Sequence, residues 1–211
     1  AIVHPERQVR MTWRQLAAET DCLARGLLAL GVHRGDRVAL WAGNIPQWII
    51  VMFAVAKVGA VLVNVNTGYR EKELALLLRQ SKAAWLLVGN GIPGNDFIAT
   101  AHACIPELGQ SDLPECKEFP FLRGVVALED GVSSGMLPYT DVLGMAYKTS
   151  TVELVAREAS ISPWDVANIQ YTSGTSGVPK GVMLTHQAIL NNGYWIGHNL
   201  RLTPKDKICL P

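Results

Sequence analysis

The chain has 211 residues, 49% of them hydrophobic and 18% charged, so it can bury a large core and general disorder is excluded. Its 19 basic and 18 acidic residues leave a net charge of +1. This balance argues against a nucleic-acid partner and against electrostatic attachment to acidic membranes.

A first helix is predicted after Thr12, a plausible N-cap whose capping box is completed by Gln15. Apolar and small residues then recur at spacings of four and three, which is typical of one buried helical stripe. They are Leu16, Thr20, Leu23, Leu27 and Leu30. Gly31 is expected to end the helix in the left-handed conformation.

Alternating strands and helices follow. Strands are predicted over 37–42, 60–65 and 84–88, separated by helices over 46–57 and 70–81. Pro46 suits the first turn of its helix because the missing N–H is not needed there. This repeated β-α-β order predicts a mainly parallel sheet with helices on both faces, a three-layer α/β fold.

One apolar segment, residues 48–63, resembles a membrane span. Lys57 and Gly59 divide it into two runs, each shorter than the ~20 residues that cross a bilayer. We therefore expect a buried helix and a buried strand here, and no transmembrane segment. The N-terminus lacks the apolar stretch of a signal peptide.

The second half is less regular. We predict a helix over 97–105, a strand over 124–128, connecting helices over 139–159 and a strand over 166–171. The four cysteines form no CxxC pair and lie at no metal-ligand spacing from a histidine, so we interpret them as reduced thiols of a cytoplasmic protein. They are Cys22, Cys104, Cys116 and Cys209.

Residues 171–181 read YTSGTSGVPKG. From Thr172 to Gly177, every residue is glycine or carries a β-hydroxyl. Glycine lets the backbone approach a ligand, and exposed N–H groups can surround an anion. Lys180 adds a positive point charge. Because residues 181–184 read as a strand, we favour a phosphate-binding loop between two strands over a flexible Gly/Ser linker.

Two common nucleotide loops do not fit this segment. A Walker A loop has glycine before its lysine and Ser or Thr after it, and it opens a helix. Pro179 and Gly181 occupy those places here, and a strand is predicted to follow. Residues 171–181 do not contain a GxGxxG dinucleotide fingerprint either.

TSGTSGVPKG meets every fixed position of [ST]-[ST]-G-[ST]-[ST]-G-x-P-K-G, the signature of the adenylate-forming (AMP-binding) superfamily. Nearly the whole chain resembles that family. The segments VNTGYREKELALLLRQSKA and GVMLTHQAILNNGYWIG are most similar to fatty-acyl-CoA synthetases, particularly medium-chain members. Aryl-CoA ligases and peptide-synthetase adenylation domains remain alternatives, as does a non-catalytic phosphate-binding module.

The resemblance implies roles for individual residues. Thr172 would help to hold Mg²⁺, and Lys180 would act as a catalytic residue. The β- and γ-phosphates of ATP would be held by Ser173, Gly174, Thr175, Ser176, Gly177 and Lys180. The implied reaction joins a fatty acid to ATP as an acyl-adenylate, releases pyrophosphate and passes the acyl group to coenzyme A.

The resemblance also implies that residues 1–211 are the N-terminal portion of a larger AMP-binding domain. We therefore expect an inactive fragment of an acyl-CoA synthetase, without the rest of the large domain and the C-terminal domain. Apolar surface left uncovered would favour self-association, so a homodimer is an expectation.

Other polar residues receive simpler interpretations. His186 is read as a first-turn residue of a helix capped by Thr185, rather than as a residue of a nucleotide or acyl site. Asp165 and Asn168 are read as turn and capping residues. The predicted helix after the loop also carries Asn191, Asn192 and Trp195. A position near an acyl tunnel and a position on an ordinary helix surface explain these residues equally well.

Overall fold

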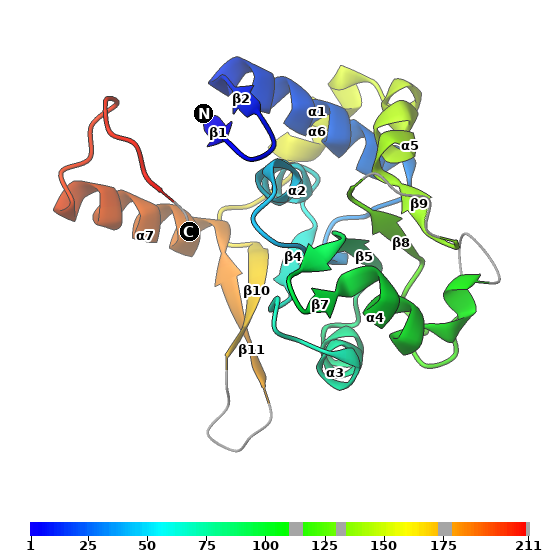
Figure 1. Cartoon of the computed structure of the whole chain (residues 1–211). Coiled ribbons are helices and arrows are strands. Elements are labelled where there is room, and N and C mark those ends of the chain that lie inside the picture. The colour runs from blue at the N-terminus through cyan, green and yellow to red at the C-terminus, as the bar shows by residue number, and fades with distance from the viewer. Residues whose placement is uncertain (110–115, 130–133, 173–178, 210–211) are drawn as a thin grey trace.

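A computed structural model describes residues 1–109, 116–129, 134–172 and 179–209. Among these residues the chain forms a seven-stranded sheet of order β11-β10-β4-β3-β5-β8-β9 (Figure 1). The β10–β11 pair is antiparallel, and the other neighbours are parallel. The strands are β3 (Arg37–Trp41), β4 (Val61–Asn64), β5 (Trp85–Val88), β8 (Gly124–Ala127), β9 (Leu137–Pro138), β10 (Val166–Thr172) and β11 (Lys180–Thr185).

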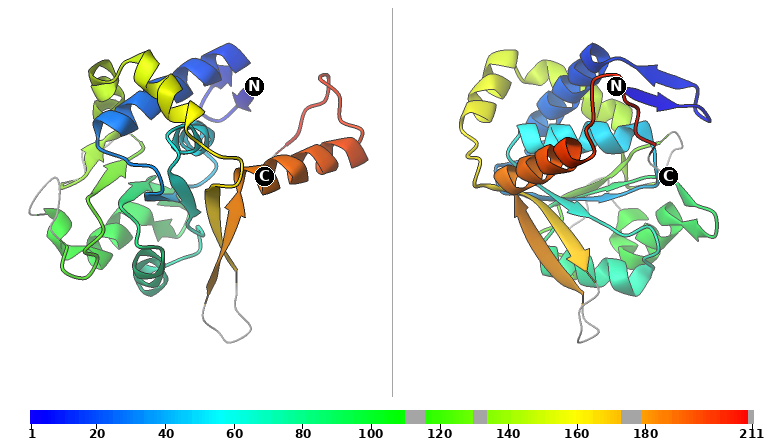
Figure 2. Two further views of the ribbon diagram at one scale, coloured as in Figure 1. Left: turned by 180° about the vertical axis from the view of Figure 1, so that it is seen from behind. Right: turned by 90° about the vertical axis from the view of Figure 1, so that its left-hand side faces the viewer.

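Helices cover both faces of this sheet, as predicted from the β-α-β order (Figures 1 and 2). One face carries α1 (Trp13–Ala29), α2 (Pro46–Lys57), α5 (Tyr139–Gly144) and α6 (Thr151–Ala159). The other face carries α3 (Glu71–Ser81) and α4 (Phe97–Cys104). Short 3₁₀ turns lie at η1 (Pro106–Gly109) and η2 (Met145–Lys148). The three-layer, mainly parallel α/β fold is confirmed.

The predicted capping box begins α1. Gln15 N donates to Thr12 Oγ1 at 3.2 Å, and Thr12 N donates to Gln15 Oε1 at 2.9 Å. Gly31 follows the helix with φ +88°, a conformation that glycine adopts without a Cβ clash. Of the predicted stripe, Leu30 is only partly buried, while its other members are buried.

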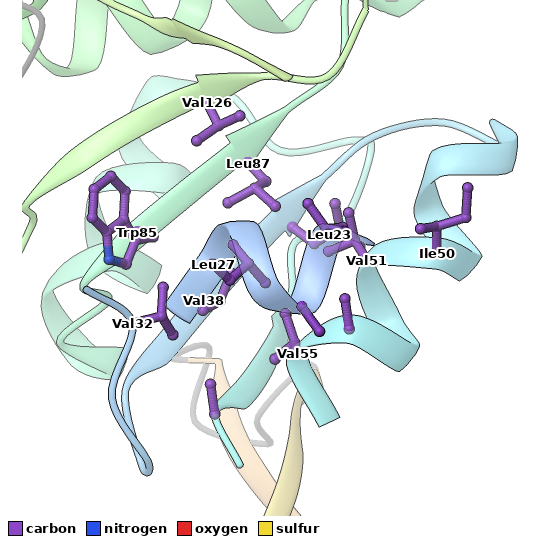
Figure 3. Close-up of a cluster of buried hydrophobic side chains, with 14 of the residues drawn as sticks. Leu23, Leu27, Val32, Val38, Ile50, Val51, Val55, Trp85, Leu87 and Val126 are labelled. Carbon is purple, nitrogen blue, oxygen red and sulfur yellow. The ribbon is translucent and has the colours of Figure 1, made fainter. Parts of the chain in front are cut away.

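Two buried clusters, one on each sheet face, form the core. Figure 3 shows the first of them, in which Leu23 and Leu27 of α1 meet Val51 and Val55 of α2 above Val38 of β3. The strands of the parallel sheet are apolar on both faces because helices cover both. Residues 48–63 are confirmed as part of α2 followed by β4.

Three short pairings have no counterpart in the sequence prediction. They are the hairpin of β1 (Ile2–His4) and β2 (Val9–Met11), the hairpin of β6 (Gly91–Ile92) and β7 (Asn95–Asp96), and the pairing of β9 with β8. Each involves at least one strand of two or three residues, too short to show the alternation by which a strand is recognised.

The last helix, α7 (His186–Asn199), extends away from the body of the molecule (Figures 1 and 2). It has no buried residue. Large apolar side chains lie exposed along it, including Leu190, Tyr194 and Trp195. The expected uncovered apolar surface is therefore present. Within the described residues, no helix is both long and apolar enough to span a membrane.

Candidate functional site: the β10–β11 hairpin

The hairpin of β10 and β11 carries the predicted phosphate-binding segment at its tip. Strand β10 ends at Thr172 and β11 begins at Lys180, and these two residues are direct partners in the antiparallel register. The strand-loop-strand order is confirmed. It differs from a Walker A loop, which would lead into a helix. The predicted residues Ser173, Gly174, Thr175, Ser176 and Gly177 lie outside the described residues.

Thr172 and Lys180 are both exposed. Residues directly opposite each other in an antiparallel pair have side chains on the same face, so the hydroxyl and the ammonium group lie on one side of the hairpin. Because β10, β4 and β3 are parallel, Thr172 also stands at the edge where their carboxyl ends meet. Ligands of open α/β sheets bind at this edge.

Next to Lys180, at the loop end of the hairpin, Gly181 is the register partner of Tyr171. A Cβ at position 181 would lie 3.0 Å from Ile169 Cγ2 and 3.4 Å from Tyr171 Cζ. Burial raises the pKa of the Tyr171 phenol, and the nearby Tyr69 raises it further. Glycine at 181 therefore lets the Tyr171 ring lie across the neighbouring strand.

The interpretation of Asn168 as a turn or capping residue is wrong. Asn168 lies within β10, is 7% exposed, and its Nδ2 donates to Leu62 O and Asn64 Oδ1, each at 3.2 Å. It links β10 to β4, a contact between segments about a hundred residues apart that no local pattern signals. Asp165 does act in a turn, since its Oδ2 accepts from Ser162 N at 2.9 Å.

The predicted position of His186 in the first turn of a helix capped by Thr185 is confirmed. It is the first residue of α7, whose N-cap Thr185 accepts from Ala188 N at 3.1 Å. It lies beyond the end of β11 opposite to Lys180, so it is remote from the predicted loop. Burial lowers its pKa, and Asp165 partly offsets that shift. Asn191, Asn192 and Trp195 are exposed on α7.

The loop joining β4 to α3 flanks the hairpin, and no site was predicted in it from the sequence. It comprises residues 65–70, at the carboxyl end of β4 and next to β10. Tyr69 of this loop and Tyr171 pack against the same core cluster. The run Asn66-Thr67-Gly68 is typical of a turn, and that signal could have marked the loop as part of the sheet edge.

The described residues near the loop fit a nucleotide polyphosphate with its magnesium ion better than a free metal ion. Among the described residues, no group of three or more His, Cys, Asp or Glu side chains could hold a metal by itself. Mg²⁺ commonly binds through few protein ligands together with substrate phosphates. An exposed threonine hydroxyl beside a lysine supplies one neutral ligand and one countercharge for such a pair.

The fold and this hairpin define a class: a mainly parallel α/β protein whose signature loop joins an antiparallel strand pair at the carboxyl edge. Residues 1–211 match the AMP-binding enzyme family. The chain belongs to that family, as its TSGTSGVPKG segment predicts.

Named relatives and a solved structure agree with this family. YngI of Bacillus subtilis, assigned by name to the acyl-CoA synthetases, is 40% identical over 100% of this chain and 39% of its own length. The mouse mitochondrial medium-chain acyl-CoA ligase ACSF2 is 31% identical, over 97% of this chain and 34% of its own length. The chain thus spans under half the length of these relatives.

The solved structure is a long-chain-fatty-acid-CoA ligase of Archaeoglobus fulgidus. It superimposes with a TM-score of 0.70 at 25% identity, covering 93% of this chain and 34% of that one.

Proposed function

We propose that the full-length protein is an ATP-dependent acyl-CoA synthetase, an acid–thiol ligase, to which residues 1–211 contribute the N-terminal portion of the AMP-binding domain. One observation carries this proposal. Thr172 and Lys180 are opposed across β10 and β11, at the two flanks of the family's signature loop and at the carboxyl edge of the sheet.

The division of roles follows the resemblance of residues 172–181 to the family's signature. Lys180, with Ser173, Gly174, Thr175, Ser176 and Gly177, binds the β- and γ-phosphates of ATP, and Thr172 contributes to Mg²⁺ binding. Attack of a carboxylate on the α-phosphate places growing negative charge on the departing pyrophosphate. Groups held in position against that charge lower the barrier, and one such donor is typically worth about 3 kcal/mol.

A fatty acid is the proposed carboxylic acid, of medium chain length, with coenzyme A as the acceptor. The names of YngI and mouse ACSF2 support an acyl-CoA product. Four free thiols support a reducing, cytoplasmic location. Exposed apolar side chains on α7 support homodimer formation by this chain when it is isolated.

The test is ATP–pyrophosphate exchange by the full-length protein with a panel of fatty, aryl and amino acids. We expect exchange with fatty acids, strongest at medium length, and thioester formation when coenzyme A is added. Exchange with amino acids and none with fatty acids would instead indicate a peptide-synthetase-like enzyme. A preference for benzoates would indicate an aryl-CoA ligase.

A second assay addresses the alternative that this chain is a phosphate-binding module without catalysis. Purified residues 1–211 are incubated with ATP, Mg²⁺, coenzyme A and a fatty acid. We expect no thioester, because most of each relative lies outside the segment that this chain matches. Thioester formation by residues 1–211 would contradict the proposal that the chain is only a portion of the catalytic unit.

A further inference from the structure

Asn95 of β7 is a buried amide, 4% exposed, whose hydrogen bonds all reach one region. Its Nδ2 donates to Thr67 O at 2.8 Å and to Tyr69 O at 2.9 Å. Both carbonyls belong to the loop between β4 and α3. One side chain therefore holds this loop at two points, across a sequence separation of more than 25 residues.

Arg70, the last residue of the loop, binds the β6–β7 hairpin in turn. Its Nη1 donates to Asn95 Oδ1 at 2.6 Å, and its Nη2 donates to Gly94 O at 2.8 Å. The guanidinium group thus spans two residues of the β6–β7 hairpin with its fixed fork of donors. With both amide atoms of Asn95 bonded, the side chain has one favoured orientation.

The beginning of the same loop is held independently. Trp41 Nε1 donates to Asn66 O at 3.1 Å, and the Trp41 ring stacks on Phe97 with centroids 4.2 Å apart. Asn66 Oδ1 accepts from Gly68 N at 2.8 Å, which fixes the turn. Trp41 of β3 therefore holds the loop at its beginning, and Asn95 of β7 holds it in the middle and near its end.

This loop lies beside the hairpin that carries the signature segment. It leaves β4 at the carboxyl edge, where β4 pairs with β10. Tyr69 and Tyr171 pack against the same buried cluster, and the Tyr171 ring lies against Gly181 of β11. Burial raises the pKa of both phenols, with Glu73 adding to the shift at Tyr69 and Tyr69 to that at Tyr171. The loop and the hairpin therefore share one buried cluster, and the loop follows directly on the strand that pairs with β10.

We propose that Asn95 is a positioning residue, which holds the β4–α3 loop and its Tyr69 on the buried cluster that also packs against Tyr171, and so fixes the hairpin strands that present Thr172 and Lys180. Asn95 acts through the β4–α3 loop and does not itself contact the nucleotide. This proposal rests on the proposed ATP-dependent function. It adds that the alignment of the phosphate-binding segment depends on an amide in a separate two-residue strand.

The test compares Asn95→Ala with Ser81→Ala in the full-length protein. Ser81 is also buried, and its Oγ donates to Leu77 O at 2.7 Å, but it lies at the end of α3 away from the hairpin. Misplacement of aligned groups by about 1 Å can cost roughly a hundredfold in rate. We expect Asn95→Ala to lower kcat of ATP–pyrophosphate exchange at least ~10-fold, with KM for ATP changed under ~3-fold.

Ser81→Ala should leave kcat within about twofold of the unchanged protein, because it removes a buried hydrogen bond without touching the loop. Equal losses in the two variants would reduce Asn95 to a general stabilising role and overturn the proposal. If Asn95→Ala does not fold, Arg70→Lys replaces it, since Arg70 is exposed and lysine lacks the fork. It should lower kcat in the same way but by less, and an unchanged kcat would overturn the proposal.

Asn95→Asp distinguishes the hydrogen bonds that Asn95 donates to the loop from the one that it accepts from Arg70. The carboxylate can still accept from Arg70 but cannot donate to the carbonyls of Thr67 and Tyr69. We expect kcat to stay as low as in Asn95→Ala, because it is the loop that positions the hairpin. Recovery of kcat in Asn95→Asp would assign the effect to Arg70 and contradict the proposed path through Tyr69.

Amide hydrogen exchange of β10 and β11 provides a measure that does not need activity. Asn95→Ala should speed exchange in these strands relative to Ser81→Ala. Suppose that Asn95→Ala speeds amide hydrogen exchange, but that the protein shows no ATP–pyrophosphate exchange with any acid. This result would uphold the positioning role and reject the proposed function. If the protein is active but Asn95→Ala changes neither amide exchange nor kcat, the proposed function is upheld and the positioning role of Asn95 is rejected.

Discussion

Thr172 and Lys180 face each other directly across the antiparallel β10–β11 pair, seven residues of loop apart along the chain (residues 173–179). This relationship sets where the signature segment begins and ends. It places a hydroxyl and an ammonium group on one face of the hairpin, so a ligand between them would meet both.

Replacing Lys180 tests this arrangement. In the full-length protein, Lys180→Ala should lower the rate of ATP–pyrophosphate exchange by roughly 10² to 10³, the loss typical of removing a positioned charge-stabilising donor. Lys180 is exposed, so the free energy of unfolding should change by no more than about 0.5 kcal/mol. Lys180→Arg should restore activity incompletely, because a planar fork replaces a compact charge.

The control for this change is Lys205→Ala, at an exposed lysine beyond α7. It should leave the exchange rate unaltered. Comparable losses at positions 180 and 205 would mean that general positive charge, and not the hairpin lysine, supports the reaction.

Gly181→Ala tests the packing between β10 and β11 at the loop end of the hairpin. The added Cβ would lie 3.0 Å from Ile169 Cγ2 and 3.4 Å from Tyr171 Cζ, so one of these side chains must shift. Overpacking of this kind costs about 1–3 kcal/mol. Urea unfolding should show the loss. Gly144→Ala is the matched control, since a Cβ there has no neighbour within 4 Å; equal destabilisation of both variants would refute the packing account.

Acidification should destabilise the protein in two separate windows. Burial lowers the folded-state pKa of His186 below 6.5, so the unfolded chain binds more protons just below that pH. The free energy of unfolding therefore falls as pH drops from about 7 through the folded-state pKa. His186→Gln should flatten this dependence. An identical slope between pH 7.5 and 5.5 in both proteins would contradict the assignment to His186.

Asp165 accounts for the loss of stability in the more acidic pH range. Its pKa is held below 3.8, first by the hydrogen bond from Ser162 N and also by Arg34, against an opposing effect of desolvation. Its stabilising contribution is present above pH 3.8 and is lost as pH falls through the lowered value. Asp165→Asn should remove that loss at low pH. Unfolding titrations below pH 4.5 would detect the difference.

Cysteine alkylation should proceed in order of burial. Burial is the main cause that raises the pKa of Cys104 to about 12, so at pH 7.5 almost none of this thiol is the reactive thiolate. Cys209 is exposed. Iodoacetamide followed by peptide mass spectrometry should modify Cys209 first and Cys104 only on unfolding. Early modification of Cys104 in folded protein would contradict its buried environment.

Local patterns determined much of this fold. The Thr12–Gln15 capping box, Pro46 at the start of α2 and Gly31 after α1 act over three or four residues, so the sequence alone reveals them. Apolar periodicity likewise predicted the β-α-β order. The signature segment predicted the family, because TSGTSGVPKG meets every fixed position of the family's pattern.

Tertiary structure decided which distant residues meet. Asn168 looked like a turn residue but is buried against β4, and Asn95 gave no signal although it holds the β4–α3 loop. Strand order, set by packing of helices on both faces, brings β10 next to β4. A buried amide takes its partners from whatever the fold places within about 3 Å. The sequence therefore determined the elements and the loop chemistry, while their contacts across the sheet depended on the folded chain.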